Sequence, residues 1–266
     1  MSRGGETGYP SISPERCPSG LRSATGNRVG GISRLVGSNP TLSVAAGSRV
    51  GDAPARAAPA DTMARMSTVG QPEPDAPRLP FPAFLTEPVE LVAEALLGCL
   101  LERTVDGQAT TVRIVETEAY DQDDAASHAF RGKTARNEVM FGESGHLYVY
   151  FSYGLHHCCN VVTGRSGHGS GVLIRAAEPV EGLELIERRR GLEGVNVTNG
   201  PGKLCQALAI DRDLNGHDLR REPLRLLAGG LEPGETVTRT TRVGISKAVE
   251  RQRRYYVTGS RHVSRR

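Results

Sequence analysis

The sequence predicts an α+β fold: a single domain with a mixed, largely antiparallel and curved β-sheet flanked by helices, preceded by a disordered N-terminal tail. Two observations predict the sheet. Expected strands outnumber expected helices, and most of them follow one another without a crossover helix between them. A third observation, a change in composition near residue 80, predicts the tail.

Residues 1–79 are rich in Gly, Ser, Pro, Ala and Arg and show neither helical nor strand periodicity. Such a segment cannot bury enough apolar surface to offset chain entropy, so we expect a disordered tail there and a domain over residues 80–266. The composition changes again near Met63 and Met66. We hypothesise that the functional chain starts at one of them; tryptic peptides from before Met63 in the native protein would contradict this.

One helix opens the domain. Thr86 is a candidate N-cap, Glu87 a first-turn acid and Pro88 a proline that the first turn tolerates. Apolar residues then recur at helical spacing, and Gly98 ends the pattern. Two more helices are expected from the same kind of spacing, over residues 183–190 and 203–210.

Strands are expected wherever a short apolar run is bounded by Gly, Pro, Asn or Asp. These runs span residues 100–105, 110–120, 147–153, 158–163, 171–176, 224–227, 236–243 and 255–259. An Asp106-Gly107 turn joins the first two runs into a hairpin. Residues 121–144 are polar and rich in turn residues, which indicates a long functional loop with one short helix.

Composition narrows the class of protein. The five cysteines are odd in number and form no CxxC pair, which favours reduced thiols in a cytosolic protein. No apolar run approaches the roughly 18 residues that span a bilayer, and no signal pattern opens the chain. The net charge of +3 comes from residues 1–79 alone, so total charge does not predict nucleic-acid binding.

Two acidic residues and a tyrosine lie close together in one expected strand. Glu116, Glu118 and Tyr120 are spaced by two residues, so all three side chains share one face. In a structural interpretation, one carboxylate pairs with Arg113 or Arg175 and the other is solvated. In a functional interpretation, a carboxylate is the general base that activates water and stabilises an oxocarbenium-like sugar.

Four of the seven tyrosines lie between residues 114 and 160. Tyr148 and Tyr150 share one strand face, and an ordinary aromatic core explains Tyr148 as well as a ring-binding site does. Tyr153 fits a core less well, because it directly precedes Gly154 at the end of its run. An aromatic side chain at a turn can enter a DNA stack and replace an extruded nucleotide.

We expect no metal and no cofactor. His156, His157, Cys158 and Cys159 are consecutive, and consecutive strand residues alternate between faces, whereas structural zinc sites use spaced pairs. The zinc-deaminase pattern and the glycine-rich loops that bind nucleotides do not occur in the predicted domain.

Nine blocks, in order along the chain, resemble the alkyladenine / 3-methyladenine DNA glycosylase family. They are IVETEAY (114–120), ASHA (126–129), GxTxRN (132–137), MFG (140–142), YVYxxYG (148–154), CNVV (159–162), VLIRAxEP (172–179), GPGKLxQAL (200–208) and VTGSRHVS (257–264). The resemblance covers the predicted domain from about residue 91 to 264.

That resemblance implies a monofunctional DNA glycosylase of base excision repair. It implies an enzyme that flips alkylated or deaminated purines out of duplex DNA and hydrolyses the N-glycosidic bond with a Glu-activated water. We therefore expect a monomer that acts on double-stranded DNA containing damaged purines, without a membrane partner, in the cytoplasm and at the nucleoid.

The resemblance also implies a role for each site residue. Glu118 matches the base that activates water, and Arg175 matches the arginine that helps to position it. The expected walls of the base pocket are Tyr120, His128, Tyr150 and Asn160. The expected DNA-intercalating residue is Tyr153. Separately from the resemblance, we hypothesise that Lys203 and Arg136 contact DNA phosphates.

Two other functions stay open. A hydrolase of small purine nucleosides would use Glu116 and Glu118 as a pair of carboxylates and would need no Tyr153. A non-catalytic module would recognise lesions in nucleic acid without cutting them. The sequence does not rank 3-methyladenine, 7-methylguanine, hypoxanthine and ethenoadenine as substrates.

Overall fold

The computed structural model describes residues 80–152 and 154–264. The tail expected over residues 1–79 and the expected intercalating residue Tyr153 lie outside the described residues, and so do the last two residues of the chain. The expected α+β fold with a curved, largely antiparallel sheet is confirmed for the described domain.

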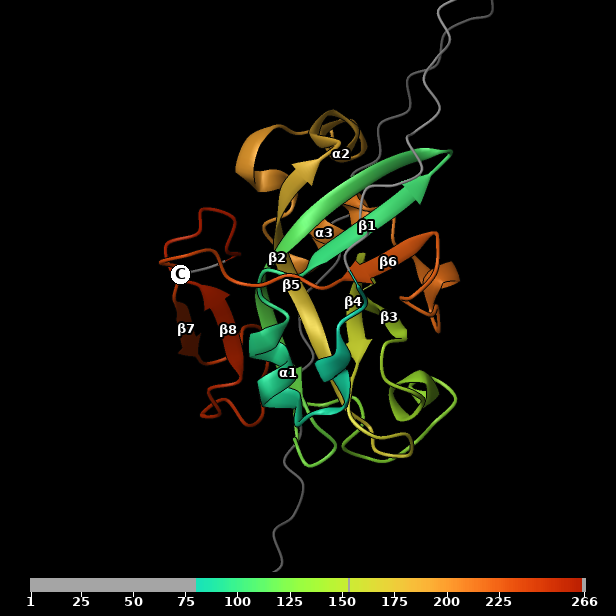
Figure 1. Ribbon diagram of the computed structural model, residues 1–266. Coiled ribbons are helices and arrows are strands. Elements are labelled where there is room, and N and C mark those ends of the chain that lie inside the picture. The colour runs from blue at the N-terminus through green and yellow to red at the C-terminus, as the bar shows by residue number, and fades with distance from the viewer. Residues whose placement is uncertain (1–79, 153, 265–266) are drawn as a thin grey trace, which may run out of the picture. The chain divides into compact units, whose positions relative to one another are not determined.

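The described strands form one eight-stranded sheet, in which six strands follow the order β3-β4-β5-β2-β1-β6 (Figure 1). Strands β8 and β7 join this path through β2, and each pair of named strands is antiparallel. The strands are β1 Leu100–Val105, β2 Gln108–Tyr120, β3 Leu147–Ser152, β4 His156–Val162, β5 Gly171–Glu181, β6 Leu224–Leu227, β7 Val237–Thr240 and β8 Arg254–Val257.

Strand β2 is the centre of the sheet and changes partner along its length. Its first half pairs with β1, from Gln108 to Arg113, and its second half pairs with β8, from Glu116 to Glu118. Strand β5 pairs with β2 on the other side and follows it as far as Tyr120. The half of β2 that carries the acidic residues is therefore held between two strands.

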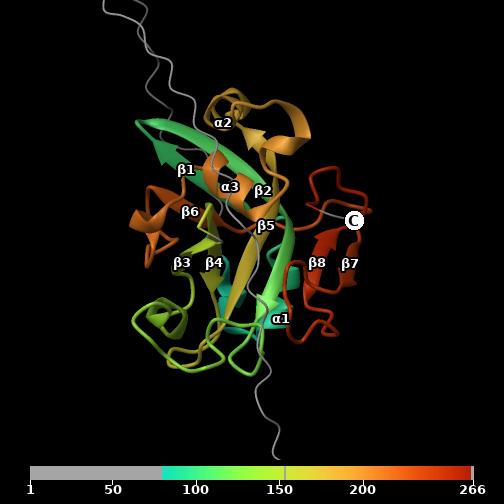
Figure 2. The same ribbon diagram turned by 180° about the vertical axis from the view of Figure 1, so that it is seen from behind.

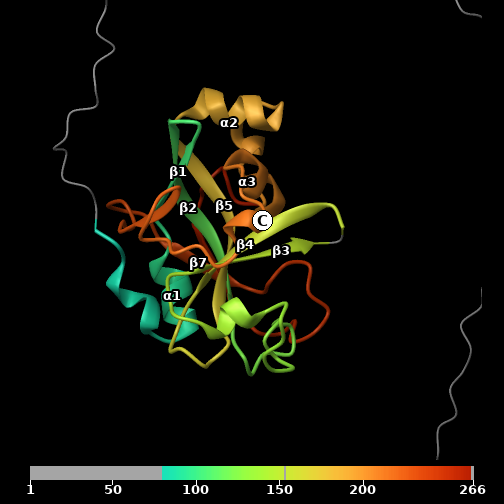
Figure 3. The ribbon, with the colours of Figure 1, turned by 90° about the vertical axis from the view of Figure 1, so that its right-hand side faces the viewer.

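Helices pack on both sides of the central strands. They are α1 Val89–Ala95, α2 Leu183–Arg190 and α3 Pro201–Ala207. Figure 3 shows α1 on one side of β2 and β5, with α3 on the other, and Figure 2 shows α2 and α3 from behind. The main core includes Val92 and Leu96 around α1 and Leu204 and Leu208 around α3. No helix in the described part of the chain is long and apolar enough to cross a membrane.

Most expected elements are confirmed, with shifted ends. Strand β5 runs to Glu181 rather than residue 176, because its outer half still pairs with β2 as far as Thr111. Helix α3 ends at Ala207, and Ala209 adopts a positive φ of 48°, which stops the helix before the expected residue 210. The N-cap of α1 is Pro88, not Thr86, because Thr86 ends a preceding 3₁₀ turn over Ala83–Thr86.

Candidate active site

Side chains in the second half of β2 alternate between its two faces, as expected. Val115 and Ala119 belong to the main core. The hydroxyl of Thr117 donates to the carbonyl oxygen of Ala93 in α1 at 2.7 Å. Glu116 and Glu118 point the other way, since both contact Arg175. The strand thus presents two carboxylates on the face opposite to α1.

Glu116 is fully buried, and both of its carboxylate oxygens accept hydrogen bonds. Its Oε1 accepts from Arg175 Nε at 2.9 Å, Arg254 Nε at 2.7 Å and Ser264 Oγ at 2.9 Å. Its Oε2 accepts one from the backbone N–H of Ser264 at 2.6 Å. The structural interpretation of one paired and one solvated carboxylate is therefore wrong, because neither Glu116 nor Glu118 reaches solvent. Arg113, its other suggested partner, pairs with Glu235 instead.

Glu118 has a different set of partners. Its Oε1 accepts from the backbone N–H of Val243 at 2.7 Å, and its Oε2 accepts from the Tyr120 hydroxyl at 2.8 Å. Arg175 Nη1 lies 3.2 Å from the same Oε2. Burial raises the pKa of Glu118, and the charge of Arg175, the Val243 N–H and the Tyr120 hydroxyl offset only part of that rise.

Arg175 on β5 joins the two carboxylates. Burial opposes its charge, but Glu118 and Glu116 outweigh burial and raise the pKa of the guanidinium. Arg175 Nη2 also donates to Ser264 Oγ at 3.2 Å, so the end of the chain closes the cluster. A guanidinium fixed in this way is a permanent cation beside the Glu118 carboxylate.

A cavity of about 780 Å³ opens beside this cluster. Arg175, Tyr120 and Val243, the three partners of Glu118, all line it, whereas Glu118 lies just behind the wall. The pocket and phosphate-contact residues expected from the sequence line it as well. These are Tyr120, His128, Arg136, Tyr150, Asn160 and Lys203.

Three rings form an aromatic wall of the cavity. His128 and Tyr150 meet edge to face, with ring centroids 4.6 Å apart, and Tyr148 stacks on Tyr150 at 5.8 Å. His128 Nδ1 lies 3.1 Å from the Tyr148 hydroxyl. Tyr148 fits both a core residue and a residue of a ring-binding site: its ring is buried, and it contacts the His128 and Tyr150 rings of the cavity wall.

Several ionisable side chains of the cavity wall are uncharged near neutral pH. Burial raises the pKa of both Tyr120 and Tyr150, so their hydroxyls stay protonated. Burial and the nearby Arg136 lower the pKa of His128, which keeps its imidazole neutral near pH 7. Burial raises the pKa of Cys158 to about 11, so this thiol is not a ready nucleophile.

Asn160 and Lys203 have defined partners in the cavity wall. Asn160 is buried, and its Nδ2 donates to the carbonyl oxygen of Tyr148 at 3.3 Å. Lys203 Nζ donates to Asn199 Oδ1 at 2.7 Å. Arg136 is exposed. Within residues 80–152 and 154–264, no group of three or more His, Cys, Asp or Glu side chains is arranged to hold a metal ion.

Sequence reasoning missed several residues of the site. Arg254 and Ser264 bond Glu116, and Val243 bonds Glu118. Ser264 lies in one of the family-like blocks, so the sequence indicated that its segment matters. Nothing in the sequence indicated that Ser264 bonds Glu116. Val243 contributes a backbone N–H, which no side-chain pattern can reveal.

Comparison with known proteins identifies the family of the chain. The model of the family described as "Methylpurine-DNA glycosylase (MPG)" matches residues 83–261. The chain belongs to the methylpurine-DNA glycosylase family. The matched range holds the aromatic wall and both carboxylates described above.

Two relatives in this family span nearly the same domain. A protein of Methanoculleus marisnigri named "Putative 3-methyladenine DNA glycosylase" is 51% identical over 188 residues, which cover 69% of this chain and 97% of the relative. A protein of the same name from Carboxydothermus hydrogenoformans is 48% identical over 186 residues, again 69% and 97% of the two chains.

Proposed function

We propose that this DNA glycosylase extrudes alkylated or deaminated purines from duplex DNA and hydrolyses their N-glycosidic bond with water activated by Glu118. One observation carries the proposal: a buried carboxylate lies behind the wall of an aromatic cavity, and its partners Arg175, Tyr120 and Val243 line that cavity. We infer that the reacting water binds at this wall next to Arg175, which orients it for Glu118.

The aromatic wall suits a cationic base. Alkylation of a ring nitrogen makes a purine cationic and a good leaving group, so one carboxylate that activates water is enough and no strong general acid is needed. A cation over each favourable aromatic face gains about 0.5–2 kcal/mol. Tyr120, Tyr150 and neutral His128 supply such surfaces. The Asn160 amide at the wall can discriminate among purine edges.

Extrusion of the base adds selectivity before any contact with the pocket. Unstacking and unpairing a nucleotide costs a few kcal/mol and costs least for damaged or mispaired bases. We propose that Tyr153 fills the space that the base leaves, and that Lys203 and Arg136 contact phosphates at the mouth of the cavity. The enzyme then acts as a monomer on double-stranded DNA at the chromosome.

The main rival is a hydrolase of small purine nucleosides with two catalytic carboxylates. Glu116 speaks against it, because its four hydrogen bonds go to Arg175, Arg254 and Ser264, which leaves this carboxylate engaged in holding the site together. Purified protein mixed with methylated duplex DNA or with free methylated nucleosides separates the two functions. Release of base from DNA alone supports the proposal, and release from nucleosides at a similar rate contradicts it.

The third function, lesion binding without cutting, is tested in the same assay. A module of that kind retains methylated duplex in a binding experiment but releases no base in single-turnover conditions. The proposal requires base release that stops in Glu118→Gln while duplex binding persists.

A further inference from the structure

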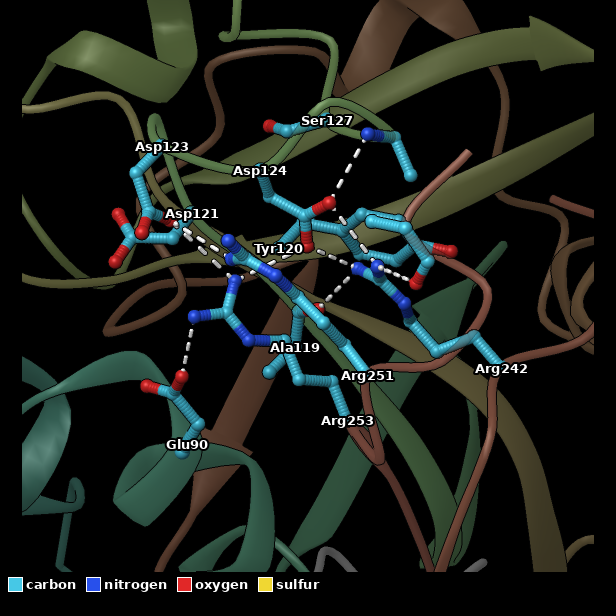
Figure 4. Close-up of polar contacts among 12 residues, drawn as sticks. Glu90, Ala119, Tyr120, Asp121, Asp123, Asp124, Ser127, Arg242, Arg251 and Arg253 are labelled. Carbon is cyan, nitrogen blue, oxygen red and sulfur yellow. Dashed lines mark hydrogen bonds and ion pairs between the residues drawn. The ribbon is translucent and has the colours of Figure 1, made fainter. Parts of the chain in front are cut away.

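A buried ion pair lies next to Tyr120. The side chains of Arg242 and Asp124 are both 0% exposed. Their contact is bidentate, with Arg242 Nη1 at 2.5 Å from Asp124 Oδ2 and Nη2 at 3.0 Å from Oδ1 (Figure 4). Arg242 Nη1 also donates to the carbonyl oxygen of Ala119 at 2.9 Å. The pair therefore fixes the guanidinium against the end of β2.

A buried ion pair is weak evidence for stability, since desolvating two charges costs several kcal/mol per ion and an apolar pair of similar volume is often as stable. What the pair does supply is a defined geometry. The Arg242 guanidinium carbon lies 4.6 Å from the centroid of the Tyr120 ring, as a cation over an aromatic face. Figure 4 shows Asp124, Arg242 and Tyr120 together.

Arg242 reaches Glu118 by two routes. Through space, it stacks on Tyr120, whose hydroxyl donates to Glu118 Oε2 at 2.8 Å. Along the chain, it precedes Val243, whose N–H donates to Glu118 Oε1 at 2.7 Å. Tyr120 and Val243 line the cavity, whereas Arg242 is not among the described residues that do. Arg242 thus contacts both donors from outside the base pocket.

We propose that Arg242, held by Asp124, is a positioning residue that aims the Tyr120 hydroxyl and the Val243 N–H at Glu118. The proposal rests on the role of Glu118 as general base. In this arrangement, the ion pair keeps one donor on each oxygen of the carboxylate, so that Glu118 stays ionised and oriented. Arg242 itself does not line the cavity.

Asp124 also pairs with a second arginine, Arg253. A change at Arg242 therefore tests the positioning of Tyr120 and Val243 while Asp124 stays held in place. Arg253 Nη1 lies 3.0 Å from Asp124 Oδ2, and Arg253 also pairs with Glu90 of α1. Its backbone carbonyl accepts from the N–H of Ala119 at 2.8 Å. Arg253 therefore braces Asp124 and the end of β2, and Asp124 keeps a cationic partner when Arg242 is altered.

The pH dependence of excision tests whether the Arg242–Asp124 pair positions the donors to Glu118, because Glu118 must be ionised to act. Other charged and titratable groups also face Glu118, and we expect all of them except Tyr120, which Arg242 contacts, to stay in place when Arg242 is changed. They are Arg175 of β5, Glu116 and Tyr120 of β2, Arg254 of β8 and Tyr150 of β3. A change confined to the Arg242 variant then reports on the Tyr120 and Val243 donors alone.

The test measures single-turnover excision of 7-methylguanine from duplex DNA between pH 4.5 and pH 8. In Arg242→Lys the cation remains opposite Asp124, but the planar, bidentate contact is lost. We expect a plateau rate about tenfold lower, the worth of one poorly aimed hydrogen bond to a charged group. We also expect an acid limb displaced to higher pH, because a carboxylate that loses donors holds its proton more tightly.

A matched control is Arg113→Lys. Arg113 is also largely buried and also bonds one carboxylate, Glu235, through two nitrogens, but it does not line the cavity. This variant should reproduce the plateau and the acid limb of the parent protein. A wild-type plateau and a wild-type acid limb in Arg242→Lys would overturn the proposal.

A second variant removes the charges together. Asp124→Asn combined with Arg242→Met takes away both members of the ion pair, and Arg253 loses Asp124 as a charged partner but keeps Glu90. The new amide keeps an oxygen for the N–H of Ala126, which Asp124 bonds at 3.0 Å. We expect a denaturation midpoint near that of the parent protein with a slow, acid-shifted reaction. A folded double variant with the parent's rate and profile would also overturn the proposal. Full activity of Glu118→Gln would contradict the proposed function itself, whereas parent-like activity of the Arg242 variants would contradict only the positioning role of Arg242.

Discussion

Arg175 Nε lies 2.9 Å from Glu116 Oε1, in a contact that joins β5 to β2 and is closed to solvent, since the Glu116 side chain is 0% exposed. The same guanidinium reaches Glu118 through another nitrogen. Glu116 therefore sets the direction in which Arg175 presents its charge to the proposed general base, and it does so without facing the cavity.

Replacing Glu116 by Gln should destabilise the fold. Arg175 and Arg254 would each lose the charge of their shared acceptor, although Arg175 keeps Glu118. Removing one partner from a buried ion pair typically costs about 3–5 kcal/mol. Urea denaturation followed by circular dichroism measures this loss. If Glu116 were instead a second catalytic carboxylate, excision would stop while the denaturation midpoint stayed at the parent value.

Excision by the parent protein should depend on pH through Glu118. Burial raises the pKa of this carboxyl above its ordinary value, and only the ionised form can activate water. Activity should thus be present at neutral pH and fall on acidification, with a midpoint above that of an exposed glutamate. Single-turnover rates on 7-methylguanine duplex, corrected for spontaneous depurination, test this; a rate that stays constant below about pH 4.5 would contradict it.

The hydroxyl of Tyr120 has a role separable from its ring. Tyr120→Phe keeps the aromatic surface of the pocket but removes the donor at 2.8 Å from Glu118. We expect excision about tenfold slower, from the loss of one hydrogen bond to a charged group, with duplex binding unchanged. Tyr120→Leu, which loses the ring as well, should also weaken binding of the extruded base. Equal binding losses in both variants would contradict this division.

Lys203 should contact a DNA phosphate. Its ammonium lines the cavity and bonds Asn199 in the free protein. Lys203→Ala should reduce the slope of log affinity against log salt by about one unit, the effect of one lost phosphate contact. Arg188→Ala is the matched control, because Arg188 lies on α2 and does not line the cavity. An unchanged slope in Lys203→Ala would remove this residue from the DNA interface.

The sequence predicted those parts of the site that depend on strand periodicity. Spacing by two placed Glu116, Glu118 and Tyr120 on one face of β2, and the contacts of Glu118 with Tyr120 and of both glutamates with Arg175 agree with that placement, although the pairing of β2 with β5 shifts register on either side of Glu116. The family-like blocks placed His128, Tyr150 and Asn160 around one pocket, although the three come from different parts of the chain.

The sequence could not predict the contacts that depend on tertiary structure. Whether Glu116 is solvated depends on Arg254 and Ser264, which are 138 and 148 positions away along the chain. Strand pairing of β8 with β2 brings Arg254 there, and no local pattern indicates that pairing. The contact of Arg242 with Tyr120 is of the same kind, since it spans a similar separation.

The most direct test of the account is single-turnover excision of 7-methylguanine from duplex DNA by Glu118→Gln. The amide keeps the shape of the side chain but cannot accept a proton from water. We therefore expect duplex binding at the parent level and a loss of at least about a hundredfold in rate, as for removal of a general base. Excision at the parent rate by Glu118→Gln would contradict the proposed mechanism.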